Sequence, residues 1–220
     1  MVDAREGLYI GSYKMSIERF PEIETWPDEG EFIEIERAVK GMVRDSERRE
    51  GIHGDFWTGN MILEDKPLPL PISNDTDVDA AAAAAPKDQD PAEIFILDFE
   101  VSQLGSRAQD LAQCLAELYM VHHFYGASSP LQVMQGVAEA YTANRDKLKD
   151  DTGTDYETTA FQTAMHFGIH IVVIPWRFGW PMGDEMVSCL TFGNECLLRG
   201  WRRDAEWFRG GPLECLFTEQ

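Results

Sequence analysis

The sequence is poor in positive charge and has no long apolar run. It contains 19 basic against 39 acidic residues, which gives a formal net charge of −20. A chain this anionic is a poor partner for phosphate backbones and anionic lipid surfaces, so the composition argues against nucleic-acid and membrane binding. The longest apolar run, residues 167–176, contains His170 and Pro175 and is too short to span a bilayer.

Paired cysteines and an export signal are also missing. The four cysteines form no C-x-x-C pair, and the first residues, MVDARE, lack the apolar core of a secretory signal. We therefore expect reduced thiols in a cytoplasmic protein.

What is present predicts an α+β chain that is mostly helical. Residues 1–27 stay unassigned, with a short strand and turn expected at Gly7–Gly11. A helix is predicted from Asp28, because apolar residues recur at helical spacing on one face: Phe32, Ile35, Val39 and Met42. Two short strands with a tight loop between them follow at 52–63, and Ile94–Leu97 is expected to be a buried strand. Four further helices are predicted, capped by Ser106, Ser129 and Thr154 or spanning 184–209.

Residues 64–93 differ in composition from the rest. They hold five of the eleven prolines, eight acidic residues and a run of alanines, with no apolar period. This composition predicts a solvated, disordered insertion.

Three polar segments stand out around this insertion. Asp55 and Asn60 are five positions apart in HGDFWTGN (53–60), and Asp98 follows the strand in ILDFE (96–100). Protein kinases have the same spacing between the Asp and Asn of the catalytic loop, followed by a strand-borne Asp. Carboxylate and amide oxygens suit Mg²⁺, and a second carboxylate suits the aiming of an acceptor hydroxyl.

Together with Asp110-Leu111-Ala112, these segments resemble the aminoglycoside phosphotransferase and choline kinase family, which includes fructosamine and methylthioribose kinases. The resemblance covers residues 28–220 and implies the C-terminal lobe of a protein-kinase-like fold. It implies phosphorylation of a small molecule with ATP and Mg²⁺. Asp55 would be the catalytic base, and Asn60 and Asp98 the metal ligands. Asp110 would support the catalytic loop by accepting backbone N–H bonds, and His53 would be structural.

The N-terminal lobe of that family has no counterpart in the sequence. No G-x-G-x-x-G loop and no strand lysine precede His53, where Lys14 and Lys40 are the only lysines. We therefore expect a lobe without its partner lobe and without a nucleotide-binding lysine. An exposed apolar face on such a lobe would favour self-association.

Two functions follow from these observations. One is an ATP- and Mg²⁺-dependent small-molecule kinase, with an acceptor that the acidic composition suggests is cationic. The other is a non-catalytic or truncated kinase-like lobe that acts as an interaction module or is an inactive fragment.

Ordinary structural roles are the alternative interpretation at individual residues. Asp55, Asn60 and Asp98 also suit ordinary turns and strand ends, and Asp110 suits the first turn of a helix. Glu100 is either a third ligand or a solvent-facing acid. His166 and His170 have the spacing of a metal pair but no evident third ligand, so packed histidines are expected. Four tryptophans line either a substrate pocket or the core: Trp176, Trp180, Trp201 and Trp207.

Overall fold

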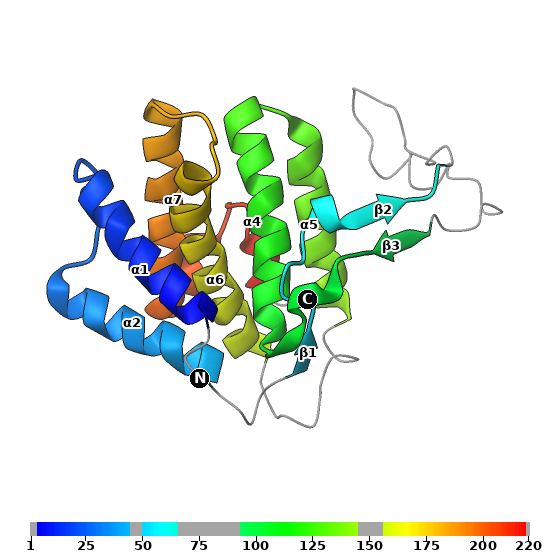
Figure 1. Ribbon diagram of the computed structural model, residues 1–220, viewed down its shortest axis with the longest axis horizontal. Coiled ribbons are helices and arrows are strands. Elements are labelled where there is room, and N and C mark those ends of the chain that lie inside the picture. Colours follow the sequence, from blue (N-terminus) through cyan, green and yellow to red (C-terminus); the bar gives the residue numbers. More distant parts are fainter. Residues whose placement is uncertain (1–3, 45–49, 66–92, 145–155, 219–220) are drawn as a thin grey trace. The chain divides into compact units, whose positions relative to one another are not determined.

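The computed structural model describes residues 4–44, 50–65, 93–144 and 156–218. These residues form six α-helices and two two-stranded antiparallel sheets, an α+β arrangement dominated by helices (Figure 1). The helices are α1 (Ala4–Arg19), α2 (Glu29–Arg44), α4 (Arg107–Tyr125), α5 (Ser128–Ala143), α6 (Tyr156–Arg177) and α7 (Asp184–Trp201). The strands are β1 (Glu50–Ile52), β2 (Met61–Leu63), β3 (Ile94–Ile96) and β4 (Gln103–Gly105).

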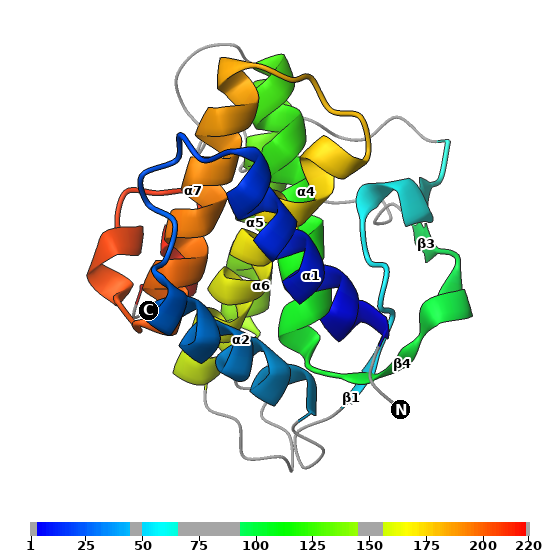
Figure 2. The same cartoon turned by 60° about the vertical axis from the view of Figure 1, so that its left-hand side comes forward.

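The chain divides into two compact units. The first, the helical unit, runs to Thr58 and resumes at Phe99, and the second, the ribbon unit, is Gly59–Asp98. In the helical unit α6 is central: α4 and α7 pack along it, α5 packs on α4, and α1 lies across α6 (Figure 2). This position follows from the sequence of α6, which is apolar around most of its circumference and is buried along most of its length.

Helices α6 and α7 approach each other very closely because glycines face the contact. A Cβ atom on Gly168 would lie 2.4 Å from the carbonyl oxygen of Gly193 and 2.5 Å from the backbone nitrogen of Leu197. Real side-chain atoms do not tolerate such distances to backbone, so any larger residue at 168 would force the two helices apart. The close contact buries apolar side chains of both helices, among them Ile169, Val172 and Leu197.

Residues 4–19 form helix α1, so the strand and turn predicted at Gly7–Gly11 were wrong. Tertiary contacts outweigh the weak helical preference of the glycines here. Tyr13 is fully buried and donates to Asn194 Oδ1 of α7 at 2.6 Å. Ser16 is also buried, and its hydroxyl donates to the Val172 carbonyl of α6 at 2.9 Å.

Helix α2 confirms the periodicity in the sequence. Asp28 caps it by accepting from the Glu31 N–H at 2.8 Å. Ile35 and Val39 are buried in the core with Tyr13, while Phe32 and Met42 pack against that core from its edge.

The predicted boundaries of the later helices are partly confirmed. Ser106 caps α4 as predicted, by accepting from the Ala108 N–H. Helix α5 begins one residue earlier than the expected cap at Ser129, after Ala127, with no side-chain cap. Helix α6 continues past Pro175 to Arg177, and the cap predicted at Thr154 lies outside the described residues.

Helix α7 is shorter than predicted, because it ends at Trp201 rather than near Arg209. Arg203 has a positive φ of 55°, which interrupts the helix, and Asp204 then caps a separate 3-10 turn at Ala205–Phe208. Hydrophobic spacing alone did not signal this break.

The predicted strands form, but the two on either side of the tight loop at 52–63 do not pair with each other. β1 pairs with β4 (Glu50 opposite Gly105) in the helical unit, and β2 pairs with β3 (Met61 opposite Ile96) in the ribbon unit. The burial predicted for Ile94–Leu97 was wrong, since these side chains are between 40% and 58% exposed. Within the described residues of the ribbon unit, the two strands have no second layer to cover them. Most of the predicted insertion, residues 66–92, lies outside the described residues.

Among the helices of the described residues, none combines the length and the apolar character that crossing a bilayer requires.

Candidate functional site

The loop after β1 is fastened to the first turn of α4 by Asp110. Its Oδ2 accepts from the His53 N–H at 2.7 Å, and its Oδ1 accepts from the Gly54 N–H at 2.8 Å. Gly54 has a φ of 85°, a left-handed conformation that a residue with a side chain adopts only at a cost. The contact expected from the family resemblance is therefore present. The positive φ explains why glycine stands between His53 and Asp55.

His53 is buried inside this loop and contacts it on several sides. Its Nδ1 accepts from the Asp55 N–H at 3.2 Å, so this nitrogen carries no proton in that contact. Its ring centroid lies 4.6 Å from that of Phe99, and its carbonyl accepts from the Ser102 hydroxyl at 3.2 Å. Through these contacts His53 connects the backbone of the loop to Phe99 and Ser102.

The Asp55 side chain is half-buried and contacts α4. Gln113 donates from Nε2 to Asp55 Oδ1 at 2.7 Å. Sequence reasoning missed Gln113. A signal was available, because residues 110 and 113 are three apart on a helix and therefore lie on the same face.

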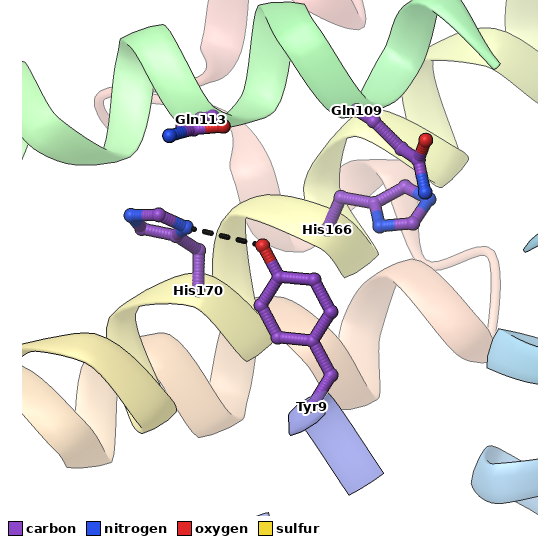
Figure 3. A pocket seen from close by; sticks show the side chains of 5 residues that line it. All are labelled: Tyr9, Gln109, Gln113, His166 and His170. Carbon is purple, nitrogen blue, oxygen red and sulfur yellow. Dashed lines mark hydrogen bonds between the residues drawn. The ribbon is translucent and has the colours of Figure 1, made fainter. Parts of the chain in front are cut away.

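Behind this contact, polar side chains of three helices converge on a small cavity (Figure 3). Tyr9 comes from α1, Gln109 and Gln113 from α4, and His166 and His170 from α6. The cavity has a volume of about 10 Å³, close to the lower limit for one water-sized group. We call this group of five residues the polar cluster.

His170 is engaged on both ring nitrogens. Its Nε2 lies 2.8 Å from Glu117 Oε1, and its Nδ1 lies 3.5 Å from the Tyr9 hydroxyl. The Glu117 side chain is only 14% exposed, so this pair is largely shielded from solvent. Helix α4 thus faces α6 with polar residues at four-residue spacing, Gln109, Gln113 and Glu117.

His166 is buried beside this pair. Burial, and secondarily the charge of His170, lowers the pKa of His166 to about 4, so the ring is neutral at physiological pH. Within the described part of the chain, its Nε2 atom has no hydrogen-bond partner. The described residues also contain no group of three or more His, Cys, Asp or Glu arranged to hold a metal ion. The hydrogen bonds of His170 and the burial of His166 are those of packed histidines.

In the ribbon unit, the two predicted metal ligands lie at the same end of the two strands. The Leu97 N–H donates to the Asn60 carbonyl at 2.9 Å, one pair beyond Met61 and Ile96, and Asp98 follows directly. Asp98 has a φ of 64°, uncommon outside glycine though Asp tolerates it better than most residues. Asp98 and Glu100 are both exposed. A shared site of Asn60 and Asp98 with Asp55 of the helical unit stays a prediction.

The two lysines considered for nucleotide binding, Lys14 and Lys40, lie on helices α1 and α2. Lys40 forms an ion pair with Glu36 one turn away. The sequence predicted that neither lysine lies on a strand, and both lie on helices.

Three of the four tryptophans pack on the apolar core. Trp176 donates from Nε1 to the Ser16 hydroxyl at 2.9 Å, and Trp180 and Trp201 pack against buried clusters. Trp207 lies 6.1 Å from Phe192, centroid to centroid, and helps to line a separate cavity of about 150 Å³.

Comparison with protein-family models and with curated proteins gives no match for this chain.

Proposed function

We propose that this chain is the C-terminal lobe of a phosphotransferase of the aminoglycoside phosphotransferase type, which transfers phosphate from ATP to a hydroxyl of a small molecule. The observation that carries the proposal is the fastening of the HGD loop to α4. Both oxygens of Asp110 accept backbone N–H groups of His53 and Gly54, which presents the next residue, Asp55. A turn formed only by local preference would not need a partly buried link to a residue more than fifty positions away.

Asp55 would aim the acceptor hydroxyl and take its proton. Phosphoryl transfer passes through a loose transition state, so positioning matters more than the strength of the base. A half-buried carboxylate fixed by hydrogen bonds suits that task, because its orientation is set before the acceptor arrives.

Asn60 and Asp98 would hold Mg²⁺, which neutralises charge on the phosphates when it is bound. They fit the metal in two respects. Both offer oxygen atoms, and the register of the ribbon brings them to one end of the two strands. Asp98 is also exposed and therefore accessible to a nucleotide.

An interaction module is the second candidate, favoured by the apolar surface of the ribbon. Six neighbouring apolar side chains are at least 40% exposed: Ile62, Leu63, Ile94, Phe95, Ile96 and Leu97. Such a surface usually marks contact with another protein or domain. This function needs no nucleotide, so nucleotide binding separates the two candidates.

Titration calorimetry with MgATP, and with ATP in EDTA, is the direct test. We expect binding that needs magnesium and is lost in Asp98→Asn. We expect Asp55→Asn to keep the affinity for MgATP within about twofold while turnover falls at least 100-fold. Asp184→Asn is the matched control, since it makes the same change at an exposed position in the first turn of α7.

No heat of binding with the wild-type chain would overturn the kinase proposal and favour the interaction module. Sedimentation that shows association growing with protein concentration would support that second candidate. Full turnover in Asp55→Asn would remove Asp55 as the base even if MgATP binds.

A further inference from the structure

Gln113 contacts the carboxylate on which the proposed reaction depends. Its Nε2 donates to Asp55 Oδ1 at 2.7 Å, a short distance that is typical of a donor facing a charged acceptor. We propose that Gln113 is a positioning residue, which fixes the plane of the Asp55 carboxylate toward the acceptor hydroxyl. This inference rests on the proposed function and extends it from the loop to helix α4.

Contacts within the loop fix the backbone of Asp55. Asp110 holds the two preceding N–H groups, and His53 Nδ1 accepts from the N–H of Asp55 itself. Gln113 adds a donor to the carboxylate from a rigid helix, since α4 is buried on its other face through Leu111, Leu115 and Leu118.

The chemistry of glutamine suits this task. An amide N–H orients a carboxylate but carries no charge, whereas an ammonium or guanidinium would form an ion pair and weaken the carboxylate as a proton acceptor. The neighbouring ring of His166 agrees with this, because burial holds its pKa near 4 and keeps it uncharged. The polar cluster therefore offers Asp55 a neutral donor and no cation from His166.

Gln113→Leu and Gln113→Glu test the inference by two different changes. Leucine removes the donor, and glutamate keeps the size but sets a like charge against Asp55. With MgATP as substrate and ADP as the measured product, we expect kcat to fall about 10- to 100-fold in Gln113→Leu and further in Gln113→Glu. The KM for MgATP is expected to stay within about twofold. Gln135→Leu and Gln135→Glu, at an exposed position on α5, are the matched controls.

The contact itself is measured without any turnover. In ¹H–¹⁵N spectra of the full chain, Asp55→Ala should shift the side-chain amide protons of Gln113 and leave those of Gln135 in place. Unchanged Gln113 signals, or full kcat in Gln113→Leu, would overturn the inference alone. Absence of MgATP turnover in the wild-type chain would overturn the proposed function and this inference with it.

Discussion

The two faces of α6 differ in chemistry. Toward α7 the helix is apolar and meets its neighbour so closely that Gly168 has no room for a methyl group. Toward α4 and α1 it presents His166 and His170 to other polar side chains. Both faces are buried, but only burial of the apolar face stabilises the fold without the free-energy cost of removing polar groups from water.

The polar face of α6 contributes less to the stability of the fold than the apolar face. Buried histidines and glutamines lose water and must find partners, so they stabilise less than apolar residues of the same size. The polar face of α6 meets Gln113, which in turn contacts Asp55. The apolar face of α6 packs against α7. Departures from good core packing are expected where a function requires them.

The largest effect is expected on the apolar face. Gly168→Ala should lower the free energy of unfolding by about 3 kcal/mol, because the added methyl group meets the backbone of α7. Urea denaturation followed by circular dichroism measures it. Gly136→Ala on α5 is the matched control, since a Cβ there meets nothing within 4 Å, and it should stabilise by about 0.5–1 kcal/mol. Equal effects of the two substitutions would show that the close approach of α6 and α7 is not what stabilises the fold.

A smaller effect is expected on the polar face when the pH is lowered. The pKa of His166 is lowered to about 4 in the folded chain, so the unfolded chain binds more protons between pH 6.5 and pH 4. Stability that is full above pH 6.5 should therefore decrease as the pH falls. We expect a loss of about 2 kcal/mol between pH 7 and pH 5.

Urea denaturation at both pH values, compared with His166→Leu, isolates this contribution. The variant should show a pH dependence weaker by the same amount, because the titrating ring is gone. Identical pH dependence in the two chains would mean that His166 is not the group responsible.

The smallest effect concerns the pair of Glu117 and His170, also on the polar face. Glu117→Gln keeps the size and a hydrogen bond to His170 but removes the charge, and should cost about 1 kcal/mol. A double-mutant cycle with His170→Asn measures the coupling of the two residues. A coupling below about 0.3 kcal/mol would show that the two side chains act independently.

Local signals in the sequence were sufficient for several features. The periodicity after Asp28 gave α2 and its cap, and Ser106 gave the start of α4. The link from Asp110 to the backbone of His53 and Gly54 was anticipated from the family resemblance, and it is present. Each of these rests on short-range spacing or on a motif.

Features that depend on distant parts of the chain were missed. Helix α1 has two glycines and a weak pattern, and its contacts to α6 and α7 complete its burial. The strand at Ile94–Ile96 is as apolar as a core strand, yet it lies exposed in a two-stranded ribbon. The contact of Gln113 with Asp55 joins residues 58 positions apart.

The amino-acid sequence by itself determined that five helical segments follow Asp28, although not where the last one ends. It also determined where the candidate base stands and that the chain is strongly acidic. These properties arise from neighbours along the chain and from composition. Only the tertiary structure decided which polar side chains meet behind Asp55 and which apolar side chains remain exposed, because burial and hydrogen bonding depend on residues that folding alone brings together.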